Sequence, residues 1–200
     1  MQGKKRVKKI KITKIAGICG ILIPIVVFVS IWLAMLDAPW FRWTHNALSD
    51  LGVGGLSAFF FNNGLVLGGL LAFVFSIGLT KTLSNKAGAY ILALSSLALI
   101  GAGLFPKTIF AAHYVSSVAF FVFLTLALFV LGVTMKQEQP KQSIGVIAII
   151  FALFACSSPV FLKILSGIAI PEAVVCFPAF VWCMMYGYKM TTHEQIGKTL

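Results

Sequence analysis

A short polar stretch, Phe41–Gly52, carries most of the side chains in this sequence that could bind a ligand or do chemistry. Two more candidates lie far along the chain. The candidate ligand-binding residues are Arg42, His45, Asn46, Ser49, Asp50, His113 and Glu172. An arginine pairs with a phosphate through parallel charge-assisted hydrogen bonds, and Asp50 would orient Arg42 or His45. These residue types predict a site for a lipid headgroup or for a membrane protein partner.

The same residues allow a metal-dependent alternative. His45, His113 and Asp50 could bind a metal ion that activates water, and Glu172 could then act as the base. The protein would be a membrane-embedded hydrolase or transferase acting on lipid. The spacing matches no known metal motif such as H-E-x-x-H, so no metal or other cofactor is predicted.

Two further chemistries use fewer groups. His113 and Asp50 could activate Ser49 or Ser116 as a nucleophile. A haem would need two intramembrane histidines on facing helices, and the predicted spans contain one. The four cysteines lack the paired spacing of a zinc or redox motif. No motif demands catalysis, so the sequence leaves open whether the protein is an enzyme.

The elements that must position these residues are membrane helices. Of the 200 residues, 60% are hydrophobic and 10% are charged, with a mean hydropathy of +1.00; soluble domains carry about 25% charged residues. Five uncharged runs are each at least 20 residues long, which suffices to cross about 30 Å of hydrocarbon: Ile15–Leu36, Leu56–Thr80, Ala87–Pro106, Thr108–Met135 and Ser143–Leu162. A sixth run, Ala173–Tyr188, is long enough if Ile168–Glu172 joins it. We predict an all-α polytopic integral membrane protein with six transmembrane helices in one bundle.

The charge distribution predicts the orientation. With six spans, 13 of the 16 cations lie on the side of the termini, and Arg42, Lys107 and Lys163 lie on the other. The positive-inside rule then places both termini in the cytoplasm of a multi-pass cell-membrane protein. The net charge of +11 follows from this topology and from contact with anionic lipids, and predicts no nucleic-acid partner. The predicted organisation is a basic cytoplasmic N-tail over 1–14, a transmembrane domain over 15–190 with an outer loop over 37–55, and a cytoplasmic C-tail over 191–200.

The outer loop has its own local signals. Trp40 and Trp43 suit the level of the lipid headgroups. Asn46 is a candidate N-cap and Gly52 a candidate stop for a short interfacial helix. That helix would place Asn46 and Asp50 one turn apart. The polar cluster is therefore expected at the outer mouth of the bundle.

Two distant residues are expected to join this cluster. His113 would lie about 8 Å below the outer end of the fourth span if that helix starts near Thr108, and an ionisable group in a span usually faces the bundle interior. We predict that His113 and Asp50 lie within reach of each other, directly or through one intermediary. Glu172 follows a proline at the expected start of the last helix, and Lys163 is a candidate counter-charge for these acids.

The depth at which charged residues lie along the predicted bundle distinguishes a binding site from a transport path. All charged candidates lie in the outer third of the predicted bundle, and the middle and inner thirds hold none. Proton or ion transport usually needs relay groups at several depths. The pattern favours a site open to the outer face or the outer leaflet, with membrane lipids as partners.

Three short motifs carry a resemblance to a known family. They are WTHNALSDLG (Trp43–Gly52), FP (Phe105, Pro106) and HYVSS (His113–Ser117). With these motifs the chain resembles the prokaryotic family known as domain of unknown function 998, whose members are six-helix membrane proteins. It is more faintly similar to the eukaryotic Frag1/DRAM/Sfk1 membrane proteins, through Ser49, Asp50, Gly52 and His113. Some of those proteins are tied to lipid remodelling or organisation, so the resemblance implies a lipid-related role.

Overall fold

The computed structural model describes residues 2–161 and 164–196, and in these ranges every regular element is a helix. The elements are α1 (Gln2–Leu36), the 3₁₀ helix η1 (Leu48–Gly52), α2 (Gly55–Thr82), α3 (Ala87–Leu104), α4 (Phe110–Lys136), α5 (Gln142–Ala155), α6 (Ser158–Phe161) and α7 (Ala169–Ile196). Within the described ranges, five helices (α1, α2, α3, α4 and α7) are long and apolar enough to cross a membrane. The prediction of an all-α polytopic membrane protein is confirmed at this level.

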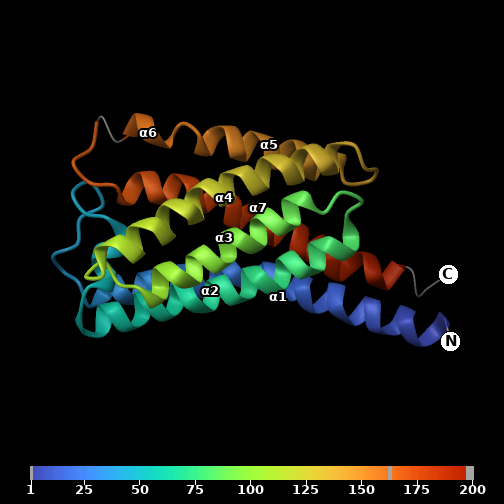
Figure 1. Ribbon diagram of the computed structural model, residues 1–200, viewed down its shortest axis with the longest axis horizontal. Helices are drawn as coiled ribbons and strands as arrows, with labels where there is room; N and C mark the ends of the chain where they lie inside the picture. The colour runs from blue at the N-terminus through green and yellow to red at the C-terminus, as the bar shows by residue number, and fades with distance from the viewer. Residues whose placement is uncertain (1, 162–163, 197–200) are drawn as a thin grey trace.

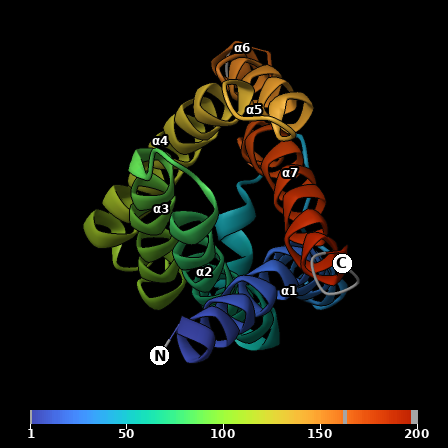
Figure 2. The same cartoon turned by 90° about the vertical axis from the view of Figure 1, so that its right-hand side faces the viewer.

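The long helices lie side by side with short connections at two ends (Figure 1). Both chain ends lie at one end, together with the α2–α3 and α4–α5 connections; we call this the terminal end. The opposite end, which we call the η1 end, holds η1, the α3–α4 connection and α6. Viewed from the terminal end, the helices form a ring in which α1 contacts α2 and α7, α3 contacts α2 and α4, and α5 contacts α4 and α7 (Figure 2).

The helix α5, which corresponds to the fifth predicted span, is shorter than predicted. The run Ser143–Leu162 was expected to be one span, but α5 has 14 residues, about 21 Å, which is less than the hydrocarbon thickness. The helix ends where the Ser157 hydroxyl donates to the Phe154 carbonyl (2.7 Å) and where Pro159 lacks the N–H that would continue the ladder. Together with α6, α5 still carries the chain to the η1 end (Figure 1).

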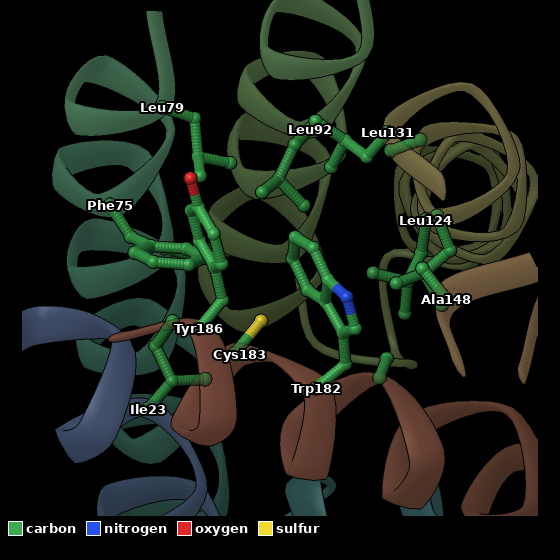
Figure 3. Close-up of a cluster of buried hydrophobic side chains, with 14 of the residues drawn as sticks. Ile23, Phe75, Leu79, Leu92, Leu124, Leu131, Ala148, Trp182, Cys183 and Tyr186 are labelled. Carbon is green, nitrogen blue, oxygen red and sulfur yellow. The ribbon is translucent and has the colours of Figure 1, made fainter. Parts of the chain in front are cut away.

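The interior toward the terminal end is filled by large side chains. Trp182 of α7 is fully buried and its ring stacks on Tyr186 at a centroid distance of 5.8 Å, while Phe75 of α2 meets it edge-on. Figure 3 shows these rings pointing between the helices with leucines around them. Close-packed side chains of this kind leave little free volume, so the hollow part of the molecule lies nearer the η1 end.

Two glycines on α2 let this helix pack closely against α1. Gly64 and Gly68 are buried, and a Cβ on either residue would collide with Ser30 or Val27 of α1. The absence of side chains lets the two helices approach closely. This contact sets the position of α1. Residues 37–54, which connect α1 to α2 and which we call the η1 segment, continue from α1 toward the site.

Candidate functional site

Asp50 organises the η1 segment. Its carboxylate accepts hydrogen bonds from the Ala47 amide (2.9 Å) and the Asn46 side-chain amide (3.3 Å), and it forms an ion pair with Lys107 of the α3–α4 connection. Asn46 and Asp50 are thus in contact, although Asn46 lies before the 3₁₀ helix and not in its first turn as expected. The expected N-cap is wrong: Ala47 occupies that position, because the Asn46 side-chain oxygen accepts from the Arg42 amide instead (2.8 Å). The predicted stop at Gly52 is correct.

The charge on Asp50 is stabilised by these partners. Partial burial opposes ionisation, but the hydrogen bond and the positive charge from Lys107, with the two amide donors, outweigh it and lower the pKa of Asp50. Asp50 therefore carries a negative charge at neutral pH. Its cation is Lys107, not Arg42 or His45 as the sequence suggested.

Backbone hydrogen bonds attach the η1 segment to the start of α7. The Gly167 amide donates to the Thr44 carbonyl and the Ala169 amide to the Asn46 carbonyl, both at 2.9 Å. The Leu48 amide donates to a carboxylate oxygen of Glu172 (2.7 Å). This third bond brings Glu172 to the segment that holds Asp50.

The other side of the η1 segment is attached to α2. The Ser57 hydroxyl donates to the Leu51 carbonyl (2.8 Å) and the Asn62 amide to the Gly52 carbonyl (3.0 Å). The Asp37 carboxylate accepts from the Ser57 amide (2.9 Å) and so caps the first turn of α2. The segment is thus hydrogen-bonded to two helices that are far apart in sequence.

His113 faces the interior, as expected for an ionisable group in a span. Its side chain is buried, and Nδ1 lies 2.8 Å from the Phe105 carbonyl oxygen. A carbonyl can only accept, so Nδ1 carries the proton, and in the neutral ring Nε2 is left to accept from the Ser117 hydroxyl at 3.3 Å. Because α4 begins at Phe110 and not near Thr108, His113 lies about 4.5 Å along the helix and not 8 Å.

A cavity of about 450 Å³ lies between α4 and the start of α7. Its polar lining residues are Ser49, Lys107, His113, Tyr114, Ser117, Ser158 and Glu172. Its other walls are apolar and include Phe110, Val118 and Ile168, each exposed on the side of the bundle. We call this cavity the α4–α7 groove.

A smaller cavity of about 90 Å³ continues the groove into the bundle. The two share Ser49, His113, Ser117, Phe121 and Glu172 as walls. The inner cavity is otherwise lined mainly by aliphatic and aromatic side chains such as Phe28, Leu65 and Phe180. The shared polar groups Ser49, His113, Ser117 and Glu172 therefore lie where the two cavities meet.

The structure divides the predicted site residues into three groups. Ser49, His113 and Glu172 line the α4–α7 groove. Asn46 and Asp50 hold the η1 segment through the hydrogen bonds described above. Arg42 and His45 are exposed and are not among the groove-lining residues.

Four polar groove residues were not among the predicted set: Lys107, Tyr114, Ser117 and Ser158. Lys107 was counted only among the three cations on the side away from the termini, although it lies beside the FP motif. Ser117 was passed over for Ser116, whose hydroxyl is turned toward Gly101 of α3. Ser117 follows His113 by four residues, which places the two side chains on the same face of a helix. This spacing is the sequence signal that could have identified Ser117.

The predicted His113–Asp50 proximity remains a prediction, because the hydrogen bonds described for each side chain go to other partners.

The metal-binding alternative is not supported by the placement of its ligands. His45 is exposed and its Nδ1 pairs with the Thr44 hydroxyl (2.7 Å), while Asp50 is bound to Lys107. Across residues 2–161 and 164–196, no three His, Cys, Asp or Glu side chains are grouped to hold a metal ion. The counter-charge role considered for Lys163 lies outside the described residues.

A bundle of apolar helices with a groove near one end defines a polytopic membrane protein with a lateral cavity. The chain belongs to the family described as protein of unknown function DUF998, whose model matches residues 21–189. The matched region includes the η1 segment and every residue that lines the groove. Neither the curated proteins nor the solved structures gave a match. The faint likeness to the Frag1/DRAM/Sfk1 proteins therefore stays a prediction.

Proposed function

We propose that this protein binds a membrane lipid in the α4–α7 groove, with the headgroup at the polar residues and an acyl chain along the apolar wall. The observation that carries the proposal is the position of the groove. It combines Lys107, His113 and Glu172 with apolar side chains that are exposed on the flank of the bundle. Sites for small amphiphiles have this composition: apolar walls with a few convergent polar groups.

The orientation supports a lipid from the outer leaflet. If the terminal end, with its excess of Lys and Arg, is cytoplasmic, the groove lies at the outer membrane face. Lys107 is the cation of the groove, and its side chain is 40% exposed, so it can contact a phosphate while it remains paired with Asp50. Lys107 thus takes the phosphate-binding role that the sequence suggested for Arg42.

Native mass spectrometry of the protein released gently from its own membranes tests this proposal. We expect a retained phospholipid in the wild-type protein. Val118→Trp should fill the groove and reduce that retention strongly. Val122→Trp is the matched control, because Val122 is equally apolar and exposed one turn further along α4 but lies outside the groove-lining set.

Other results would point elsewhere. A wild-type protein without bound lipid would overturn the proposal and favour a protein partner at this face. Equal lipid retention by the two tryptophan variants would place the lipid somewhere other than the groove. Lys107→Ala should reduce lipid retention, and Arg42→Ala should leave it unchanged. If both variants lose lipid to a similar extent, Arg42 contacts the phosphate, as the sequence suggested.

A further inference from the structure

The α4–α7 groove contains both a cation and a carboxylate. Lys107 and Glu172 both line it, and Glu172 lies within electrostatic range of Lys107 and of Asp50. A ligand that carries charges of both signs could satisfy both groups.

A cationic group in the ligand would stabilise the carboxylate of Glu172. One of its carboxylate oxygens accepts the Leu48 amide hydrogen, and within residues 2–161 and 164–196 the ion pairs are Lys107–Asp50 and Lys141–Glu138. A buried carboxylate is costly unless it is both paired with a cation and hydrogen-bonded, and the Leu48 amide supplies only the hydrogen bond. An ammonium group would supply the charge and up to three N–H donors.

Lys107 can serve a phosphate at the same time. Its ammonium has three donors, and the described structure gives it one acceptor, Asp50. The remaining N–H groups are free to contact phosphate oxygens, where hydrogen bonds between charged groups are strong.

Resting on the proposed lipid-binding function, we infer that the preferred lipid headgroup carries a primary amine beside its phosphate, as in phosphatidylethanolamine. The ammonium binds Glu172 and the phosphate binds Lys107. Other headgroups fit less well. A headgroup with negative charge alone meets the carboxylate of Glu172, and the one lysine of the groove already has its charge paired with Asp50. A choline headgroup has the positive charge but offers no N–H donor.

A methylation series tests this inference without any mutation. The full-length protein is purified, stripped of native lipid and offered equimolar mixtures of lipids with identical acyl chains: phosphatidylethanolamine, its N-methyl and N,N-dimethyl forms, phosphatidylcholine and phosphatidylglycerol. Retention is read by native mass spectrometry. We expect it to fall with each added methyl group, with ethanolamine over choline by roughly tenfold, the size of effect that one hydrogen bond to a charged group supports. Phosphatidylglycerol should also bind less well than phosphatidylethanolamine.

Variants then assign the preference to a residue. Glu172→Gln should abolish the ethanolamine preference while total lipid retention persists. Glu138→Gln, which removes the carboxylate paired with Lys141 at the terminal end, is the matched control and should retain the preference. If Glu172→Gln does not fold, the methylation series on the wild-type protein decides the question.

Failure of the headgroup inference can be distinguished from failure of the proposed lipid-binding function. Equal retention of the ethanolamine and choline lipids by the wild-type protein would overturn the inference and leave the proposed lipid-binding function standing. The same conclusion follows if Glu172→Gln retains the preference. Retention of none of these lipids by the wild-type protein would overturn the proposed function itself.

Discussion

At the scale of single residues, the polar cluster separates into side chains that hold the loop and side chains that face the groove. Asp50 belongs to the first group, since it joins the start of η1 to Lys107. His113 and Glu172 each hydrogen-bond a backbone group of a neighbouring segment, and both side chains also line the cavity. Residue type alone does not distinguish these roles, because a carboxylate suits either.

Asp50→Asn should lower stability in a pH-dependent way. The folded pKa of Asp50 lies below its ordinary value of 3.8, so the ionised carboxylate stabilises the fold above pH 3.8, and this contribution is lost as the pH falls through the folded pKa. We expect an effect of about 1 kcal/mol from the partly exposed ion pair at neutral pH. Thermal unfolding of both proteins in detergent from pH 7 to pH 3 measures it. The difference should shrink in acid, and a difference independent of pH would contradict the assignment.

At the scale of elements, the site depends on a close backbone contact between the η1 segment and the start of α7. Gly167 donates to Thr44, and a Cβ at position 167 would lie 2.5 Å from the Asn46 amide nitrogen and 2.6 Å from its carbonyl oxygen. Backbone atoms have little room to move away. The short α5 matters equally, because the chain breaks near the groove and supplies Ser158 to its wall.

Gly167→Ala should therefore weaken the fold and the groove together. We expect a loss of about 1–3 kcal/mol, as for other overpacked positions, with reduced lipid retention. Gly54→Ala is the control, since an added Cβ there meets no atom within 4 Å and the backbone is extended. Thermal unfolding and native mass spectrometry of both variants provide the comparison. Equal stability of the two would show that the contact at Gly167 is unimportant.

At the scale of the whole molecule, the two ends of the bundle differ in construction. The terminal end is closed by polar contacts between loops: Glu138 accepts from the Ser84 amide (2.8 Å) and pairs with Lys141 (2.6 Å). Lys141 also donates to the Thr82 carbonyl. The η1 end instead contains the groove. A molecule tied at one end and hollow near the other suits a binding site better than a continuous transport path.

The proposed orientation can be tested by labelling single cysteines in intact cells. In a background with all four native cysteines replaced by serine or alanine, Gly54→Cys should react with a membrane-impermeant maleimide added outside. Gln137→Cys should react only after permeabilisation. Both positions are exposed and lie in connections at opposite ends of the bundle. The reverse pattern would place the groove on the cytoplasmic side.

Much of the architecture was predictable because it follows from composition. Runs of apolar residues without charge must lie in a membrane and must be helical to satisfy their own backbone hydrogen bonds. These facts predicted the five long spans, the loop between α1 and α2 and the inward orientation of His113. The end of α5 was not predictable from hydropathy. Pro159 is a local signal that weakens a helix at this place, but Pro24 and Pro178 lie inside continuous helices, so a proline does not by itself fix where a helix ends.

The sequence by itself determined that the chain forms membrane helices and that its candidate site residues lie toward the end away from the termini, because the cost of burying charge in hydrocarbon acts locally on each segment. Tertiary structure alone decided which of those residues share a cavity. Lys107 meets Asp50 across 57 positions, and Glu172 meets Leu48 across 124. Such pairings depend on how the helices pack around the ring, and a local pattern in one helix does not encode that packing.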